Sequence, residues 1–473
     1  MTKTRTGRGD PWPRRALVVA AAAMLVAAAC GPSAGTQAPT QAATAAPPVA
    51  SAAPGASEAA PSTGITLPDG PVTLRVAYYN AGGQTEIDYR QAQAEAFTKA
   101  HPNVTLKMEP VADWGETLYP QLAAETAADV LWADTDTGYG QMVAKGAYQS
   151  LKPFVDAEGF DLSKWPEGMV KHFSGQDGGL LLLPNSNLSF NFLYYNKDLF
   201  DKASVAYPTA DWTLDDLTAA AKKLSAKGEQ WGFSFAWDDL YLTWMRMYGC
   251  EFTDDGTNPT KYTYNGPGCA KALEDLDKLS RDGIVNWELG AKWGGLAPGD
   301  STGERAFSNG DAAMLLSGTW EAPSIVTNSE GAFQFDAAPA PMAPGGTIQG
   351  AASGFGVYAK SKNPEWAWEY VKYLAGPEGQ AADAGAGLGQ SPIAAILDEV
   401  YCKNDAPPTS KCEVAKVGAE STQWEPNTEK WGPGFWDVIG PAVQAGFTAD
   451  TPPDWQALLD AAAATSQQAA PLP

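Results

Sequence analysis

Strands and helices alternate along the chain after about residue 70. Apolar and polar residues alternate over 72–78 and 104–108, the period-two pattern of half-buried β-strands. Between these segments apolar residues recur at helical spacing, and His101-Pro102 ends the run. The apolar segment 129–133 follows as a buried strand. This order predicts an α/β lobe with a largely parallel sheet, whose ligands would bind at the carboxyl ends of the strands.

The same pattern continues through the rest of the chain. Thr213-Leu214-Asp215-Asp216 is typical of a capping box and predicts a helix that runs to about Leu224. Residues 305–316 predict a short helix, a turn and a strand. Further strands are predicted over 180–184, 190–195 and 353–359, and further helices over 119–127, 268–282, 364–374, 436–445 and 455–464. A chain of 473 residues is long enough for two lobes.

An apolar segment near the N-terminus predicts export. Arg14 and Arg15 precede 14 uninterrupted apolar residues, 16–29, and then Cys30. A membrane-spanning helix needs about 20 apolar residues, whereas a signal peptide needs about 7–15. Ala27-Ala28-Ala29-Cys30-Gly31 resembles a bacterial lipobox, so we expect residues 1–30 to be a lipoprotein signal peptide and Cys30 to be acylated. The alternative is an ordinary secretion signal that leaves Cys30 unmodified.

A low-complexity segment follows. All residues of 31–64 except Val49 and Glu58 are Ala, Pro, Gly, Ser, Thr or Gln. Such a segment has little apolar surface to offset the entropy of ordering it. We therefore expect residues 31–70 to be a disordered tether between a lipid anchor and the folded part.

The remaining cysteines predict disulfides. Cys250, Cys269, Cys402 and Cys412 make an even number in an exported chain, which indicates two bonds. Three pairings are possible, and we favour the local ones, Cys250–Cys269 and Cys402–Cys412. The absence of a C-x-x-C spacing argues against a redox motif or a zinc ribbon.

Composition excludes several functions. The net charge of −23 argues against a nucleic-acid partner, because such proteins neutralise phosphates with Lys and Arg. It also argues against electrostatic binding of a polybasic segment to anionic lipids. Only two histidines are present, His101 and His172, so histidine-based catalysis and zinc chemistry are mostly excluded. Nothing points to a cofactor or a metal, whereas the 17 tryptophans call for an explanation.

Eight segments in order resemble the family 1 extracellular solute-binding proteins, the maltose-binding-protein type, of ATP-binding-cassette (ABC) importers, here in lipoprotein form. The resemblance covers residues 72–465 and rests on VTLRVAYYNAGG, HPNVTLKME, DVLWADTD, KGAYQSLKPFV, LPNSNLSFNFLYYNKDLFDKA, DWTLDDLTAAAKKL, FSNGDAAMLLSGTWE and SGFGVYAKSKNPEWAWEYVKYLAGPEGQ. It implies the type II periplasmic-binding-protein fold, two α/β lobes that are joined by crossing strands and close on a ligand by hinge motion.

The resemblance also implies lobe boundaries. The crossings fall near 184–187, 350–353 and 389–392. The first lobe would comprise residues 71–186 plus 353–390, and the second lobe residues 187–352 plus 391–473. The protein would act as a cell-surface monomer that delivers its ligand to a membrane permease.

The chemistry of sugar binding indicates which residues to expect in the site. Aromatic faces pack on the C–H face of a pyranose, and carboxylates and amides bond its hydroxyls. By resemblance, Trp320 and Trp436 match stacking aromatics, and Asp134 or Asp136 matches a hydroxyl-binding acid. Core packing is the alternative for each tryptophan, and a helix cap near Gly138 is the alternative for the aspartates. The further candidates are Asn80, Glu86, Trp132, Asn187, Trp237 and Glu321.

Two classes of function compete. The favoured one is a carbohydrate-binding protein of an importer, which breaks no bond; a binding protein for a polyamine, a peptide, a glycerol phosphate or a metal is the alternative ligand class. The other is a secreted glycoside hydrolase, which needs two carboxyl groups on opposite sides of the scissile bond. Asp238-Asp239 and Asp215-Asp216 are merely adjacent in the sequence, which does not supply that geometry.

Overall fold

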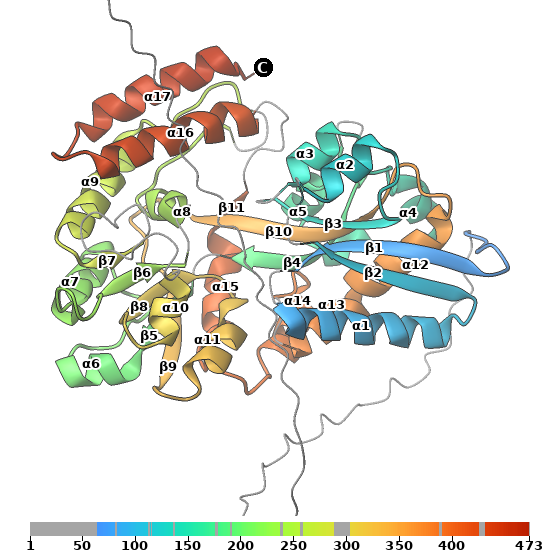
Figure 1. Ribbon diagram of the computed structural model, residues 1–473, viewed down its shortest axis with the longest axis horizontal. Coiled ribbons are helices and arrows are strands. Elements are labelled where there is room, and N and C mark those ends of the chain that lie inside the picture. The colour runs from blue at the N-terminus through green and yellow to red at the C-terminus, as the bar shows by residue number, and fades with distance from the viewer. Residues whose placement is uncertain are drawn as a thin grey trace, which may run out of the picture. The chain divides into compact units, whose positions relative to one another are not determined.

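The computed structural model describes residues 64–80, 83–111, 114, 116–135, 138–175, 178–189, 192–236, 240–255, 259–287, 303–386, 390–424 and 431–472. The expected signal peptide, its Cys30 and most of the expected tether lie outside these residues. The described helices and strands form two sheets, each covered by helices (Figure 1). Among the described residues, no helix is long and apolar enough to span a membrane.

The first sheet is mixed and contains six strands. Its order is β11-β10-β3-β1-β2, and β4 also pairs with β10. The strands β1, β2 and β3 run parallel, as the sequence predicts, but β10 runs antiparallel to both β3 and β4. The strands are β1 (Val72–Tyr79), β2 (Val104–Val111), β3 (Val130–Asp134), β4 (Leu183–Ser189), β10 (Ile348–Val357) and β11 (Thr422–Trp424).

Helices cover the first sheet on both sides. On one side α1 packs beside α12, with the ring of Phe97 4.8 Å from that of Tyr370, while α2 and α3 lie on the other side of the strands from α1 (Figure 1). The helices around this sheet are α1 (Gly83–Ala100), α2 (Leu118–Ala123), α3 (Tyr139–Ala144), α4 (Lys152–Glu158), η1 (Leu162–Lys164), α5 (Glu167–His172), α12 (Pro364–Ala375) and α13 (Pro377–Gly385).

The second sheet has five strands in the order β7-β6-β8-β5-β9. These are β5 (Phe192–Asn196), β6 (Phe233–Phe235), β7 (Val285–Asn286), β8 (Met314–Ser317) and β9 (Phe335–Pro339). All five residues of β5, the middle partner of β8 and β9, are buried. The helices of this part are α6 (Lys197–Ala203), α7 (Leu214–Leu224), α8 (Leu240–Met247), α9 (Pro267–Arg281), α10 (Gly303–Ser308), α11 (Glu321–Ser329), α16 (Trp431–Thr448) and α17 (Trp455–Ala469).

Two long strands carry the chain away from the first sheet and back. The strand β4 precedes β5 of the second sheet, and β10 follows β9. Ser186 of β4 lies opposite Ser353 of β10, and Asn187 lies opposite Ala352. The segments that the resemblance gives as the first two crossings are therefore paired with each other.

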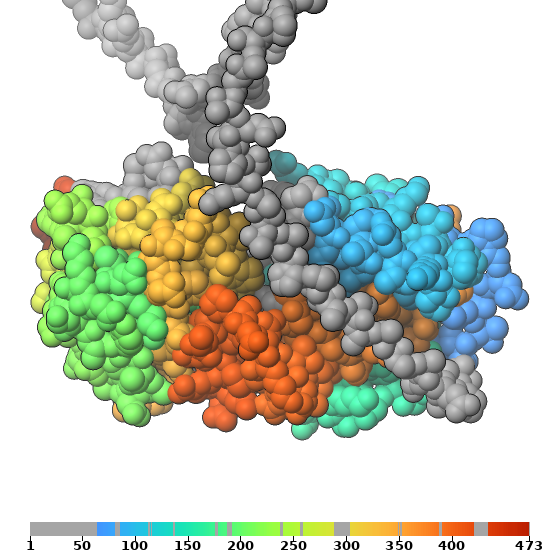
Figure 2. Space-filling model, turned by 90° about the horizontal axis from the view of Figure 1, so that it is seen from below, coloured from blue at the N-terminus to red at the C-terminus, as the bar shows by residue number. Residues whose placement is uncertain are grey.

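A third segment, residues 390–424, contacts elements of both sheets. It contains α14 (Ala394–Ile396), the π-helical turn η3 (Leu397–Tyr401) and α15 (Lys411–Ser421). Asn404 donates a hydrogen bond to the carbonyl of Gly385 at the end of α13, and the Ser410 N–H donates one to Asp336 of β9. In Figure 2 the orange surface of this region lies between the yellow-green and the blue parts of the molecule.

Both favoured disulfides are present. Cys250 is bonded to Cys269, and Cys402 is bonded to Cys412. The predicted capping box is also present, because the Asp216 N–H donates to the Thr213 hydroxyl and the Thr213 N–H donates to Asp216. The end of the expected tether packs on the folded part: Ile65 and Leu67 contact the core, and the Trp366 indole donates to the Pro68 carbonyl.

Candidate functional site

Three strand ends of the first sheet bring candidate residues together. The strand β1 ends at Tyr79 and β3 ends at Asp134, and the two strands pair in parallel with Val76 opposite Val130. Asn80 follows β1, and its N–H donates to the carbonyl of Val111 at the end of β2. Because parallel strands end at the same edge of a sheet, Asn80 and Asp134 belong to one edge.

Three aromatic rings cluster at this edge. The Trp132 ring centroid lies 6.1 Å from that of Tyr79 and 6.2 Å from that of Trp114, and both pairs are stacked. The Tyr79 and Trp114 rings are 6.1 Å apart. Trp114 is buried, whereas Tyr79 and Trp132 are half-buried. Of these three residues only Trp132 is among the site residues predicted from the sequence; the signal for Tyr79 is its place directly after the predicted strand 72–78.

Polar atoms accompany this aromatic cluster, which we define as Tyr79, Trp114 and Trp132. Within the described part of the chain, the Asn80 Oδ1 and the Trp114 Nε1 are buried and have no hydrogen-bond partner. Asp134 is also buried, and Gly138, not an aspartate, is the N-cap of α3. Stacked rings beside an unpaired acceptor, an unpaired donor and a carboxylate are the groups that bind a pyranose.

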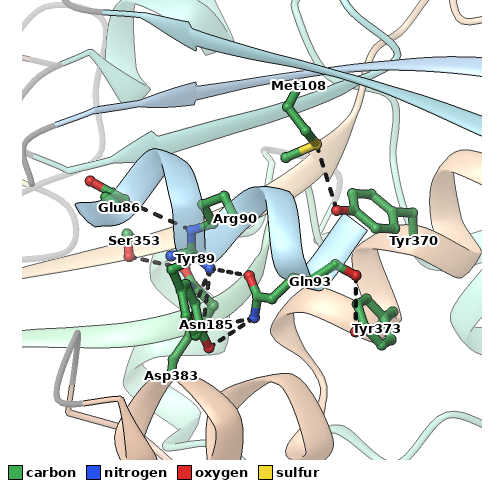
Figure 3. Close-up of polar contacts among 10 residues, drawn as sticks. All are labelled: Glu86, Tyr89, Arg90, Gln93, Met108, Asn185, Ser353, Tyr370, Tyr373 and Asp383. Carbon is green, nitrogen blue, oxygen red and sulfur yellow. Dashed lines mark hydrogen bonds and ion pairs between the residues drawn. The ribbon is translucent and has the colours of Figure 1, made fainter. Parts of the chain in front are cut away.

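A buried ionic cluster lies beside the start of α1. The Arg90 Nη1 is 3.2 Å from both carboxylate oxygens of Asp383, and its Nε is 3.8 Å from the Glu86 Oε1. Figure 3 shows Arg90 between Glu86, in the first turn of α1, and Asp383 on α13. Burial raises the pKa of Tyr78, and the charge of Glu86 raises it further. Arg90 and Asp383 were not among the predicted residues.

Two more of the predicted residues, Trp320 and Glu321, follow strand β8 of the second sheet. Trp320 is half-buried at the start of α11, and its ring covers Gly318: a Cβ atom on that glycine would lie 2.0 Å from the Trp320 Cη2. Glu321 is buried and accepts a hydrogen bond from the Ser317 hydroxyl at 3.3 Å. Burial raises the pKa of Glu321 to about 9, and the charge of Glu304 contributes to the shift. The raised pKa favours the protonated form of Glu321 in the folded protein.

The other predicted residues are not part of these clusters. Trp436 is half-buried on α16 and packs edge-to-face against Phe435, at 5.2 Å between ring centroids. Asn187 lies in β4, opposite Ala352, and only its backbone is described. Asp136 and Trp237 lie outside the described residues. Within the described ranges no group of three His, Cys, Asp or Glu side chains could hold a metal ion.

The sequence matches a known family over most of its folded part. Residues 82–381 match the family model described as bacterial extracellular solute-binding protein. Over 196 residues, 38% of this chain and 41% of the relative, it is 30% identical to the sn-glycerol-3-phosphate-binding periplasmic protein UgpB of Agrobacterium fabrum. The chain thus matches less than half the length of this curated relative.

Solved structures share the fold. An ABC substrate-binding protein of Listeria monocytogenes in complex with cycloalternan superposes with a TM-score of 0.72 and 24% identity, over 84% of this chain and 99% of that one. The maltotriose binding protein of Thermus thermophilus, bound to maltotriose, gives a TM-score of 0.66 and 22% identity, over 84% and 99% of the two chains. These similarities establish the two-lobed α/β fold for this chain.

Proposed function

Since this chain belongs to the bacterial extracellular solute-binding proteins, we propose that it is the substrate-binding component of an ABC importer and that its ligand is a sugar, in particular an oligosaccharide. The aromatic cluster of Tyr79, Trp114 and Trp132 carries this proposal. A flat aromatic surface binds the apolar face of a pyranose, and the adjacent Asn80 and Asp134 supply acceptors for its hydroxyl groups.

Charge favours a neutral sugar over a glycerol phosphate. Recognition of a phosphate calls for Arg or Lys side chains that are available to its oxygens. Arg90, near the start of α1, is already surrounded by Asp383 and Glu86. Asp134 and Glu86 would repel an anion. The similarity to a glycerol-phosphate-binding protein therefore supports the binding role more than that ligand.

Hinge closure would accompany binding. We propose that residues 71–186 plus 353–390 move relative to residues 187–352 plus 391–473, with the β4–β10 pair and the segment 390–424 between them. A ligand that contacts both lobes shifts the equilibrium towards the closed form by its greater affinity for that form. The closed monomer would then deliver the sugar to the permease without breaking a bond.

The N-terminal sequence supports a lipid anchor. We propose that residues 1–29 are removed, that Cys30 becomes the acylated N-terminus, and that residues 31–64 connect this anchor to the folded part. Two or more acyl chains give stable anchoring. Mass spectrometry of the membrane fraction should find a lipid on Cys30, and Cys30→Ala should release the protein into the medium. A membrane-bound Cys30→Ala variant would contradict the anchor.

The binding site is tested by replacing one ring of the aromatic cluster. In titration calorimetry with maltotriose and mannotriose, we expect Trp132→Ala to weaken the binding of whichever sugar binds the wild type by at least about tenfold, because the stacking surface is lost. Trp212→Ala is the matched control, since Trp212 is also half-buried but packs on Phe200 of α6. Equal affinity for Trp132→Ala and the wild type would overturn the proposed site.

A further inference from the structure

The carboxylate of Asp383 is held from several directions. It accepts hydrogen bonds from the Tyr89 hydroxyl at 2.7 Å, from the Gln93 Nε2 at 3.0 Å and from the Arg90 Nη1 at 3.2 Å. Gln93 closes the network, because its Oε1 accepts from the Arg90 Nη1 at 2.9 Å. All of these groups except Tyr89 are buried. The position of the Arg90 guanidinium is therefore fixed by α13 and by its own helix (Figure 3).

One N–H of this guanidinium has no hydrogen-bond partner. The Arg90 Nε is buried and unpaired within the described part of the chain, and the Glu86 Oε1 lies 3.8 Å from it. At this distance the two groups form an ion pair, but the N···O separation is about 1 Å longer than that of a typical hydrogen bond. The Glu86 side chain is 16% exposed, twice the 8% of Arg90. Glu86, in the first turn of α1, is thus the more accessible member of its ion pair with the buried Arg90.

Glu86 belongs to the same strand-to-helix connection as Asn80, a residue of the proposed sugar site. It lies one helical turn before Arg90, at the start of the helix that follows β1 and Asn80. A carboxylate can accept hydrogen bonds from two hydroxyl groups at once only when its orientation is fixed. A glutamate whose carboxylate is not held has three rotatable bonds, and ordering them on binding would offset part of its binding energy.

We propose that Arg90 is a positioning residue for a sugar contact at Glu86: Asp383 holds the guanidinium, and the ion pair between its Nε and Glu86 keeps the Glu86 carboxylate directed towards the hydroxyl groups of the ligand. This inference rests on the proposed function, because it names one residue through which a sugar is bound. Arg90 itself stays buried and does not touch the ligand.

The test removes the positioning group without leaving a buried charge unpaired. In the double variant Arg90→Met, Asp383→Asn, both charges are removed together, which avoids the large cost of breaking a buried pair. The amide oxygen that this variant carries at position 383 would still accept from Tyr89 and Gln93. We expect the melting temperature to stay within a few degrees of the wild type, and the Kd for maltotriose or mannotriose to rise by about 10-fold or more.

A double-mutant cycle separates positioning from a general structural effect. Glu86→Gln should weaken sugar binding by about 10- to 100-fold. If Arg90 acts through Glu86, adding Arg90→Met and Asp383→Asn to Glu86→Gln should change the Kd by less than about twofold. The same loss in both backgrounds, or no loss in either, would overturn the proposal. Arg90→Lys, which keeps the charge beside Asp383 but lacks Nε, should behave like the double variant and serves if that variant does not fold.

A ligand-free crystal structure gives an independent answer. In the double variant, or in Arg90→Lys, we expect the Glu86 carboxylate to move away from residue 90. An unchanged Glu86 would overturn the positioning role. If the wild type binds neither trisaccharide, nor sn-glycerol 3-phosphate as a third probe, the proposed function fails for these ligands, and the orientation of Glu86 still decides the role of Arg90.

Discussion

At the scale of single residues, the absence of a side chain at Gly318 leaves room for the Trp320 ring. The Trp320 indole folds back over this glycine, and atoms of its six-membered ring occupy the space that a Cβ would need, at 2.0 to 2.6 Å. Real Cβ atoms do not approach other atoms so closely, so any larger residue must displace the ring. The glycine therefore leaves the space that this orientation of Trp320 needs, and we propose that Trp320 contacts the ligand.

We expect Gly318→Ala to weaken sugar binding about as much as Trp320→Ala, because both remove the indole from its present place. The matched control is Gly440→Ala in α16, where a new Cβ meets nothing within 4 Å. That change should leave binding unaffected and stabilise the helix by about 0.5–1 kcal/mol. Titration calorimetry measures the first effect and urea denaturation the second. Wild-type affinity in Gly318→Ala would show that Trp320 does not contact the ligand.

Glu321 should make stability depend on pH. Burial raises its pKa to about 9, whereas in the unfolded chain the carboxyl titrates at about 4.3. Between these values the folded protein holds a proton that the unfolded chain releases. The contribution of Glu321 to stability is therefore fully present below the unfolded pKa and falls as pH rises towards 9, by up to about 1.4 kcal/mol per pH unit.

Glu321→Gln should remove this dependence, since glutamine is neutral at every pH. We expect the wild type to lose stability relative to Glu321→Gln between pH 5 and pH 9, with the loss levelling off near pH 9. Urea denaturation of both proteins at pH 5, 7 and 9 measures the difference. A constant difference across the three pH values would contradict the raised pKa.

Among the elements, α7 is the one whose start the sequence determines most clearly. The Thr213 hydroxyl accepts from the Asp216 N–H, and the Asp216 carboxylate accepts from the Thr213 N–H. These bonds satisfy donors that the first turn of a helix leaves unpaired. We expect Thr213→Ala to lower the free energy of unfolding by about 1 kcal/mol. Thr218→Ala, at a half-buried position of the same helix that is not its cap, should have a much smaller effect in urea denaturation, and equal effects would contradict the role of the cap.

The sequence pattern predicts the long elements and several buried strands, but it misses two very short strands and one fully buried helix. The strand β1 and the helices α7 and α12 agree with their predicted ranges within one residue, because each has a clear pattern and a boundary signal. The strands β6 and β7 have three and two residues, too few to show a period. Every residue of α8 is buried, so its sequence LYLTWMRM has no polar face to reveal a helix.

At the scale of the whole molecule, contacts between residues far apart in the sequence could not be predicted from the sequence. Asp383 is 293 residues from Arg90, and neither residue carries a local motif that predicts their pairing. Trp114 joins the aromatic cluster from a loop after β2, although nothing in its neighbourhood distinguishes it from the other tryptophans. Resemblance to a family predicts where lobes and strand ends lie, whereas the partners of a buried charge depend on how the helices pack.

The most direct test is a thermal-shift screen of residues 65–473 against maltotriose, mannotriose, sn-glycerol 3-phosphate and spermidine, with each ligand recovered afterwards and analysed by mass spectrometry. A ligand that binds only the folded form stabilises it by about 2.7 kcal/mol at 100-fold its Kd, which should raise the midpoint by a degree or more. We predict a saturable shift with a saccharide that is recovered intact. A shift with only the phosphate or the polyamine would contradict the sugar ligand, and recovery of cleaved sugar would contradict the binding function.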